Sequence, residues 1–331
     1  YGIAGTGWNG LDSLQSAILP GDKVVAFNNG TFSGIDCQTI CMKASMPNDL
    51  EANPTMPHPK NVHIIDVPHG KSVDEKTIEE ALSLHKPMWA FMSHWETGSG
   101  RINDLEGFNR VCKKRGVLGL IDAVSSLGID NFAIDDYTGV VGWASCPQKG
   151  VLGLPLTYAP VSFRNNYIDI VKKRGCYNYV HHPILAARHW SIIDGKDVEV
   201  PAYHQTHSCY AIASFHEALR LSLAHGKVRK AQDYKVYEQI LRNALIAMGC
   251  IVTSNMTSLE VFNLPEELSG REKELVQKCR SENFGIWTTL SDPAQIRIGI
   301  LNQLSQQAIE EIISRFADAM MEFGCNNFEK R

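Results

Sequence analysis

The sequence predicts an α/β protein, with a mostly parallel sheet sandwiched by helices and a smaller C-terminal α+β domain. Short apolar runs alternate with amphipathic segments through the first half of the chain. From about residue 207 the sequence pattern predicts helices, and then short strands that alternate with helices. At 331 residues the chain exceeds one typical core, which favours one large and one small unit.

Composition narrows the function classes. The apolar fraction of 44% and charged fraction of 21% are ordinary for a globular protein. A formal charge of −4 leaves no electrostatic footprint for nucleic acid, and no basic run or long apolar stretch indicates a membrane. Nine scattered cysteines without a Cys-x-x-Cys motif favour free thiols in a reducing compartment, so we expect a cytoplasmic protein.

The first half reads as repeated βα units. After a loop, a helix is expected at 8–19 and ends at Pro20-Gly21-Asp22; residues 46–60, with four prolines, read as an irregular excursion. The expected strands are 23–27, 62–67, 88–93 and 117–121, and the expected helices between them are 74–84 and 104–115. Such alternation predicts a parallel sheet whose functional groups gather at the carboxyl ends of the strands.

The second half predicts two long helices followed by a compact α+β unit. The expected elements are helices 209–224 and 228–248, strands 251–253 and 259–262, helix 271–282, strand 295–301 and helix 304–322. We therefore expect a large domain over residues 1–225 and a small C-terminal domain over 226–331.

Lys149 has unusual neighbours for a lysine. It lies in a turn, with the apolar strand 140–144 before it and a Gly/Pro-shaped apolar segment up to Pro155 after it. Because burial disfavours the charged form, such an amine is a candidate nucleophile for a Schiff base with an aldehyde such as pyridoxal phosphate. A lysine at the tip of a surface loop is the alternative.

The segment from Gly5 to Gly10 matches the Gly-x-Gly-x-x-Gly dinucleotide pattern. However, no strand of useful length precedes it, and the next strand ends in Asn28-Asn29 instead of an acidic residue. These two failures argue against a nicotinamide-binding site. A Gly-rich loop that opens a helix still suits a phosphate group, and an ordinary glycine turn is the alternative.

Polar residues follow several of the expected strands. Thr97 lies in a Gly-rich turn after strand 88–93, and Asp122 ends strand 117–121, where it could cap a helix or pair with a pyridine nitrogen. Arg297 interrupts an apolar strand and needs a carboxylate, either from the protein or from a substrate. The histidines at 181, 182, 204 and 207 have no convincing metal-ligand spacing, and no metal is expected.

Taken in order, several motifs resemble the class V aminotransferases, which are pyridoxal-phosphate enzymes of fold type I. The closest branch is that of the alanine–glyoxylate and serine–pyruvate aminotransferases. The resemblance rests on the number, order and spacing of the motifs. They are the loop from Gly5, Pro20-Gly21-Asp22, Asn29-Gly30-Thr31-Phe32, His94-Trp95-Glu96-Thr97-Gly98, Asp122 to Gly128, Gln148-Lys149, Tyr203-His204-Gln205-Thr206 and Arg297-Ile298-Gly299.

The resemblance implies a role for each matching residue. Lys149 would carry the cofactor's Schiff base and shuttle a proton, and Asp122 would pair with the ring nitrogen. Val124 and Phe32 would pack on the two ring faces, and Thr97 would bind the phenolic oxygen. The phosphate would be held by Gly5, Thr6, Gly7 and Gln148. Arg297 would bind the substrate α-carboxylate, and Tyr203 and Thr206 would reach the neighbouring site of a homodimer.

The implied activity is transfer of an amino group from a small amino acid, of the alanine or serine type, to a 2-oxo acid such as glyoxylate or pyruvate. It would be a ping-pong reaction through pyridoxamine phosphate. The alternatives are a class V lyase or desulfurase, a nicotinamide-dependent oxidoreductase and a catalytically silent relative. Four residues depart from the family pattern: Phe32 replaces a tryptophan, Pro147 replaces a serine, and Trp8 and Trp95 replace smaller residues. The chain begins at Tyr1 without a methionine, so we expect the family's N-terminal segment to be absent.

Overall fold

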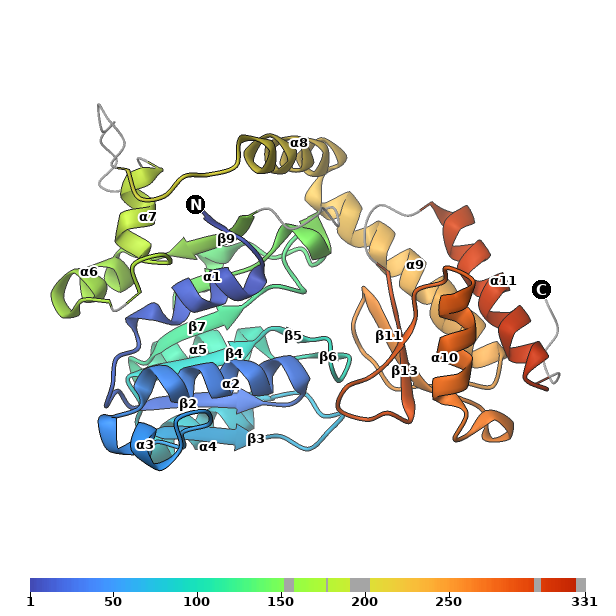
Figure 1. Ribbon diagram of the computed structural model, residues 1–331, viewed down its shortest axis with the longest axis horizontal. Helices are drawn as coiled ribbons and strands as arrows, with labels where there is room; N and C mark the ends of the chain where they lie inside the picture. The colour runs from blue at the N-terminus through green and yellow to red at the C-terminus, as the bar shows by residue number, and fades with distance from the viewer. Residues whose placement is uncertain (152–157, 177, 191–202, 301–304, 326–331) are drawn as a thin grey trace.

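The computed structural model describes residues 1–151, 158–176, 178–190, 203–300 and 305–325. Two sheets form the centres of a larger and a smaller unit (Figure 1). The predicted fold class is confirmed, because a mostly parallel sheet flanked by helices precedes a small C-terminal sheet with helices of its own.

The large sheet has seven strands in the order β1-β9-β8-β7-β4-β2-β3. Its members are β1 (Gly2–Ala4), β2 (Val24–Asn28), β3 (Val62–Asp66), β4 (Trp89–Ser93), β7 (Leu118–Asp122), β8 (Val140–Ala144) and β9 (Tyr158–Phe163). The five strands from β3 to β8 are parallel, and β9 and β1 join antiparallel at one edge. The carboxyl ends of the parallel strands therefore meet on one side of the sheet, where the candidate residues follow.

Helices cover both faces of this sheet. Their bounds are α1 (Gly7–Leu14), α2 (Thr31–Ala44), α3 (Pro47–Ala52), α4 (Glu75–His85), α5 (Leu105–Arg115), α6 (Asn165–Arg174), α7 (Pro183–His189) and α8 (Cys209–His225). Short turns are η1 (Gln15–Ala17), η2 (Ile134–Asp136) and the π-helical η3 (Pro147–Val151). The two-stranded hairpin of β5 (Trp95–Glu96) and β6 (Arg101–Ile102) extends beyond β4.

Alternating side chains of β2 explain why both faces are covered. Val24 and Ala26 pack with the apolar residues of α1, α2, α6 and α7, whereas Val25 and Phe27 pack with those of α4 and α5. Successive residues of a strand point to opposite faces, so a strand that is apolar throughout must be buried on both sides. The continuous apolar runs in the sequence have this origin.

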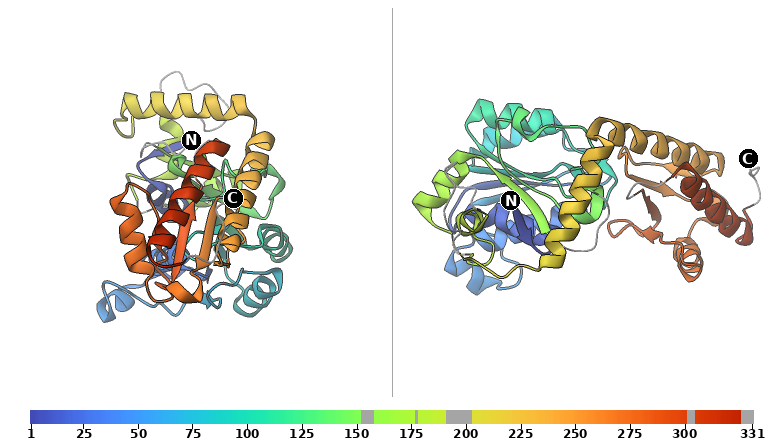
Figure 2. Two further views of the ribbon diagram at one scale, coloured as in Figure 1. Left: turned by 90° about the vertical axis from the view of Figure 1, so that its right-hand side faces the viewer. Right: turned by 90° about the horizontal axis from the view of Figure 1, so that it is seen from above.

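The small unit is an antiparallel four-stranded sheet in the order β10-β11-β13-β12. Its elements are α9 (Lys227–Ala247), β10 (Ile251–Val252), β11 (Leu259–Asn263), η5 (Glu266–Leu268), α10 (Glu272–Ser281), β12 (Trp287–Thr288), β13 (Gln295–Gly299) and α11 (Gln306–Glu322). Helix α9 leads from the large unit to the small one (Figure 2). Since α8 ends at His225 and α9 begins at Lys227, the predicted boundary falls between two helices; it stays a prediction.

Some predicted elements differ from the observed ones. The excursion at 46–60 contains α3, because Pro47 suits a first helical position and Asp49 accepts a hydrogen bond from the Met46 N–H at 2.8 Å. The helix expected at 8–19 leaves the α-helical form after Leu14 and continues as η1. Residues 301–304 and the stretch 152–155 after Lys149 lie outside the described residues.

All nine cysteines are free thiols. Among the described residues, no helix combines the length and the apolarity that a membrane crossing requires. In the same ranges, no three His, Cys, Asp or Glu side chains come together as a metal site would need.

Candidate active site

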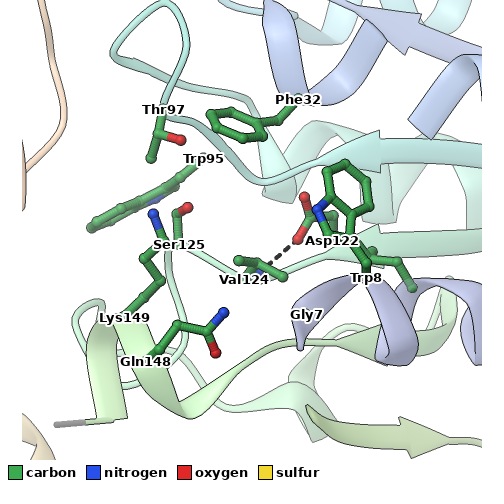
Figure 3. Close-up of a pocket in the computed structure, with 11 residues that line it drawn as sticks. Gly7, Trp8, Phe32, Trp95, Thr97, Asp122, Val124, Ser125, Gln148 and Lys149 are labelled. Atoms are coloured by element: carbon green, nitrogen blue, oxygen red, sulfur yellow. Dashed lines mark hydrogen bonds between the residues drawn. The ribbon is translucent and has the colours of Figure 1, made fainter. Parts of the chain in front are cut away.

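A cavity of about 190 Å³ lies beyond the carboxyl ends of β4, β7 and β8 (Figure 3). Loops that follow neighbouring parallel strands supply most of its walls, and α1 and α2 supply the rest. The lining residues are Gly7, Trp8, Leu11, Phe32, Trp95, Thr97, Asp122, Val124, Ser125, Gln148 and Lys149.

Lys149 lies in η3, a few residues after the end of β8, and its side chain is half-buried and lines the cavity. Burial lowers the pKa of its amine, and the positive charge of Arg297 lowers it further, while Cys146 and Asp122 act in the opposite sense. The structure thus agrees with the desolvated lysine and not with a surface loop tip. A lysine in this environment can present a neutral amine to a ligand in the cavity.

A second lysine holds the turn that carries Lys149. Lys230 of α9 is 2% exposed, and its Nζ donates hydrogen bonds to the Gly150 carbonyl and, at 3.1 Å, to the Ser222 hydroxyl of α8. Burial lowers the pKa of this amine to about 8. The turn is therefore attached to the two helices that precede and begin the small unit.

Asp122 lies at the opposite side of the cavity from Lys149 (Figure 3). It ends β7, is 6% exposed, and accepts a hydrogen bond from the Val124 N–H at 2.7 Å. Burial raises the pKa of its carboxyl group to about 7, the charge of Glu96 adds to this, and the hydrogen bond from Val124 opposes it. Such a carboxyl group becomes a stable anion once a cation lies beside it.

Phe32 and Val124 face each other across the space between Lys149 and Asp122 (Figure 3). Phe32 is fixed by Glu96, whose carboxylate accepts hydrogen bonds from the Phe32 N–H at 3.3 Å and the Ser33 N–H at 2.6 Å. Glu96 also accepts from the Gly98 N–H at 2.6 Å. A carboxylate at the N-terminus of a helix is favourable, so Glu96 stabilises the start of α2 at Thr31, with Phe32 as its second residue lining the cavity.

The Gly-rich loop forms a second wall where it enters α1. The Thr6 hydroxyl accepts a hydrogen bond from the Trp8 N–H at 3.2 Å, and Asn9 Oδ1 accepts one from the Thr6 N–H at 2.7 Å. Gly7 packs closely on the neighbouring loop, since a Cβ there would lie 2.9 Å from Val124 Cγ2. The start of this helix offers N–H groups and a positive dipole end to an anion.

Arg297 of β13 approaches the cavity from the small unit. Its side chain is half-buried and donates a hydrogen bond to the Thr97 carbonyl at 3.4 Å. Among the described residues, no carboxylate comes within ion-pair distance of it. The charge of Glu96 favours the Arg297 guanidinium from within the protein, and the assignment of a ligand carboxylate to Arg297 stays a prediction.

The structure brings most of the predicted site residues together. Those that line the cavity are Gly7, Phe32, Thr97, Asp122, Val124, Gln148 and Lys149. Gly5 and Thr6 directly precede α1, and Arg297 is close enough to influence Lys149. Tyr203 and Thr206 lie outside the lining, in the segment before α8.

Sequence reasoning missed Leu11 and Ser125 as lining residues and Glu96 as the cap of α2. Ser125 could have been found, because it lies three residues after Asp122, just beyond the end of β7. The role of Glu96 had no local signal, since the helix that it caps begins 65 residues earlier, at Thr31.

Comparisons with known proteins agree with this geometry. Residues 56–138 match the aminotransferase class-V family. The chain is 24% identical over 306 residues to the (S)-ureidoglycine–glyoxylate transaminase of Bacillus subtilis, covering 86% of this chain and 68% of that protein. It is 27% identical over 270 residues to the alanine–glyoxylate aminotransferase of Oryctolagus cuniculus, covering 79% and 66%. The chain thus spans about two thirds of the length of these relatives.

A comparison with solved structures finds the same kind of protein. The crystal structure of an alanine–glyoxylate aminotransferase from Nostoc sp. superposes with a TM-score of 0.83 at 23% identity, over 96% of this chain and 81% of that one. The predicted resemblance to class V aminotransferases and the predicted fold type I are therefore confirmed.

The cap formed by Glu96 can be tested by substitution. In Glu96→Gln one carboxylate oxygen becomes an amide NH₂ that faces a backbone N–H, so we expect the free energy of unfolding to fall by about 1–3 kcal/mol. Urea unfolding measures it. Glu79→Gln is the matched control, since Glu79 pairs on the surface with Lys114 and Arg115 and should cost under about 1 kcal/mol. If Glu96→Gln and Glu79→Gln both lowered the free energy of unfolding by the same small amount, the capping role of Glu96 would be contradicted.

The buried carboxyl group predicts a pH dependence. Because the pKa of Asp122 is raised from 3.8 to about 7, its ionisation costs the folded state up to about 4 kcal/mol. Its contribution to stability is full below about pH 4 and is lost as the pH rises to about 7. In protein without a bound ligand, Asp122→Asn should be increasingly more stable than the wild type over this window, with a constant difference above it. Thermal unfolding at several pH values measures this; a difference independent of pH would contradict it.

Proposed function

We propose that this chain, a relative of the class V aminotransferases, is a pyridoxal-phosphate-dependent aminotransferase. It moves an amino group from a small amino acid, of the alanine or serine type, to a 2-oxo acid such as glyoxylate or pyruvate. The observation that carries the proposal is the pair of Lys149 and Asp122 on opposite sides of a cavity walled by Phe32 and Val124 (Figure 3). The two relatives named above are glyoxylate transaminases, which supports the acceptor.

The residues present fit the cofactor. A flat ring between Phe32 and Val124 would have the Asp122 carboxyl group at its nitrogen, where a ring cation would offset the cost of ionising this buried acid. The Thr97 hydroxyl faces the same space (Figure 3). Gln148 and the loop Gly5-Thr6-Gly7 at the start of α1 would hold the phosphate. When bound, the cofactor supplies an aldehyde for the amino group and an electron sink for the carbanion.

Lys149 would hold and move the proton at its Nζ. Burial lowers the pKa of this amine, so its neutral form is more accessible than that of an ordinary surface lysine. Arg297 would bind the α-carboxylate of the substrate and fix its orientation. Trp8 and Trp95 occupy part of the cavity wall, which favours substrates with small side chains.

The same proposal includes a homodimer with shared sites. Tyr203 is 76% exposed, and its hydroxyl lies 3.0 Å from the Thr206 hydroxyl, outside the cavity of its own chain. Helix α8, which follows, exposes Tyr210, Ile212, Leu219, Leu221 and Leu223, and Ala218 is its buried residue. A second copy would cover this apolar face. Tyr203 and Thr206 would then reach the cofactor phosphate of the partner subunit.

The cysteines give little support to the desulfurase alternative. Cys146 lies beside Lys149, but burial raises the pKa of its thiol to about 12, so it holds little reactive thiolate. The aminotransferase remains the function that the geometry supports best.

The role of Lys149 is tested by Lys149→Ala. We expect the rate of pyruvate formation from alanine and glyoxylate to fall about 10³-fold or more, because the variant lacks both the amine nucleophile and the proton carrier. A coupled lactate dehydrogenase assay measures it, and Lys76→Ala, an exposed change on α4, is the control. Activity retained in Lys149→Ala would overturn the assignment. A wild-type protein that takes up no pyridoxal phosphate would overturn the function.

Shared sites are tested by mixing two inactive variants. In a dimer of Lys149→Ala with the double variant Tyr203→Phe and Thr206→Val, one of the two sites would have every proposed residue intact. After denaturation and refolding of an equal mixture, activity should return to about a quarter of the wild-type value, because half of the dimers are mixed. Each variant refolded alone is the control. No recovery from a mixture shown to contain mixed dimers would contradict the sharing.

A further inference from the structure

His181 contacts the first turn of α1, although it lies about 170 residues away in the sequence and between α6 and α7. Its Nε2 is 3.1 Å from Asn9 Nδ2, and its Nδ1 is 2.6 Å from Asp12 Oδ2. Asn9 and Asp12 are three positions apart on α1, so the imidazole ring spans one helical turn on a single face. This histidine has no role in the site described above.

The donor and the acceptor of each hydrogen bond between Thr6, Asn9, His181 and Asp12 can be assigned. Asn9 Oδ1 accepts from the Thr6 N–H at 2.7 Å and from the Thr6 hydroxyl at 3.2 Å, so Nδ2 is the other end of the amide and must donate. His181 Nε2 is then the acceptor, and Nδ1 carries the proton that is donated to Asp12.

Asp12, the last residue of this series of hydrogen bonds, is held by two further residues. Asp12 Oδ1 accepts a hydrogen bond from Lys43 Nζ of α2 at 2.6 Å, and Oδ2 also accepts one from Asn178. Burial alone would raise the pKa of Asp12, but the hydrogen bond from His181 and the charge of Lys43 lower it to about 2. Asp12 is therefore a permanent anion that orients the imidazole ring.

We propose that His181 is a positioning residue for the phosphate of the cofactor, acting through Asn9 and Thr6. This inference rests on the proposed function. With Nε2 as acceptor, His181 holds the Asn9 amide, which in turn fixes the Thr6 backbone and hydroxyl at the entrance of α1. Gly5 has φ +120°, and a Cβ on it would lie 2.2 Å from Asn9 Oδ1, so loop and amide fit closely. The linkage meets the cavity at the loop before α1, where the phosphate is proposed to bind.

The consequence is a selective effect on affinity. Without His181 the Asn9 amide can rotate, and the loop loses the geometry in which its N–H groups converge on an anion. Pyridoxal, which has the same ring and aldehyde but no phosphate, would not sense this change. Loss of the linkage should thus separate the two ligands, whereas a general disturbance of the fold would weaken both.

The experiment compares Kd values of pyridoxal phosphate and pyridoxal, from the yellow absorbance of the bound form, for cofactor-free wild type and variants. For His181→Phe we expect about tenfold weaker binding of pyridoxal phosphate, since one or two hydrogen bonds are lost, and pyridoxal affinity unchanged within about twofold. His181→Gln, whose amide can donate to Asp12 and accept from Asn9, should recover most of the affinity. His182→Phe, which changes the neighbouring cap of α7, is the control.

The outcomes are distinct. If the wild type binds neither ligand, the proposed function fails. If the wild type binds pyridoxal phosphate and His181→Phe binds it equally well, or loses both ligands equally, the positioning role is overturned. Should His181→Phe not fold, as judged by circular dichroism, Asn9→Ser breaks the same linkage and must show the same selective loss.

Discussion

The central constraint on this site is the cost of burying the Asp122 carboxyl group. Two other buried acids, Glu96 and Asp36, lie close to it. The charge of Glu96 raises the pKa of Asp122, and the charge of Asp122 raises the pKa of Asp36. Asp36 accepts a hydrogen bond from Gln15 at 3.4 Å, and burial and the nearby Asp122 raise its pKa well above the usual range. Backbone N–H groups donate three hydrogen bonds to the Glu96 carboxylate, whereas Asp122 accepts a backbone hydrogen bond from Val124. The charge of Lys149 lowers the Asp122 pKa only in part, so a further cation beside Asp122 would stabilise its anion. A protonated ring nitrogen beside Asp122 would supply it.

The same electrostatic reasoning applies to the cations on the other side. Burial lowers the pKa of both side chains, Lys149 and Arg297; the charge of Arg297 lowers that of Lys149 further, and the charge of Glu96 opposes the shift at Arg297. A ligand carboxylate at Arg297 would offset the cost of burying the guanidinium. An aldehyde carbon at Lys149 would react with its neutral amine. Under the proposed function, the carboxylate is that of the amino-acid substrate and the aldehyde is that of the cofactor.

The sequence predicted the large domain well where periodicity and chemistry agree. The buried strands before Thr97, Asp122 and Lys149 are continuous apolar runs, and polar residues directly after such runs had to meet at one sheet edge. Contacts between segments far apart in the sequence could not be predicted from it. Nothing near His181 in the sequence indicates α1, and nothing near Lys230 indicates the turn at Gly150. Tyr203 and Thr206 were assigned by resemblance alone, and a single chain cannot place them in a site.

The hairpin of β5 and β6 explains how the two units can share one site. Its Glu96 fixes Phe32, and its Thr97 faces the cavity. The backbone of the same hairpin also contacts the small unit: the Thr97 carbonyl accepts from Arg297 at 3.4 Å, the Gly98 carbonyl accepts from Ser291 at 3.1 Å, and the Ile102 N–H donates to Asn255 at 2.8 Å. A shift of the small unit would therefore reach both Phe32 and Arg297, through eight consecutive residues from Trp95 to Ile102.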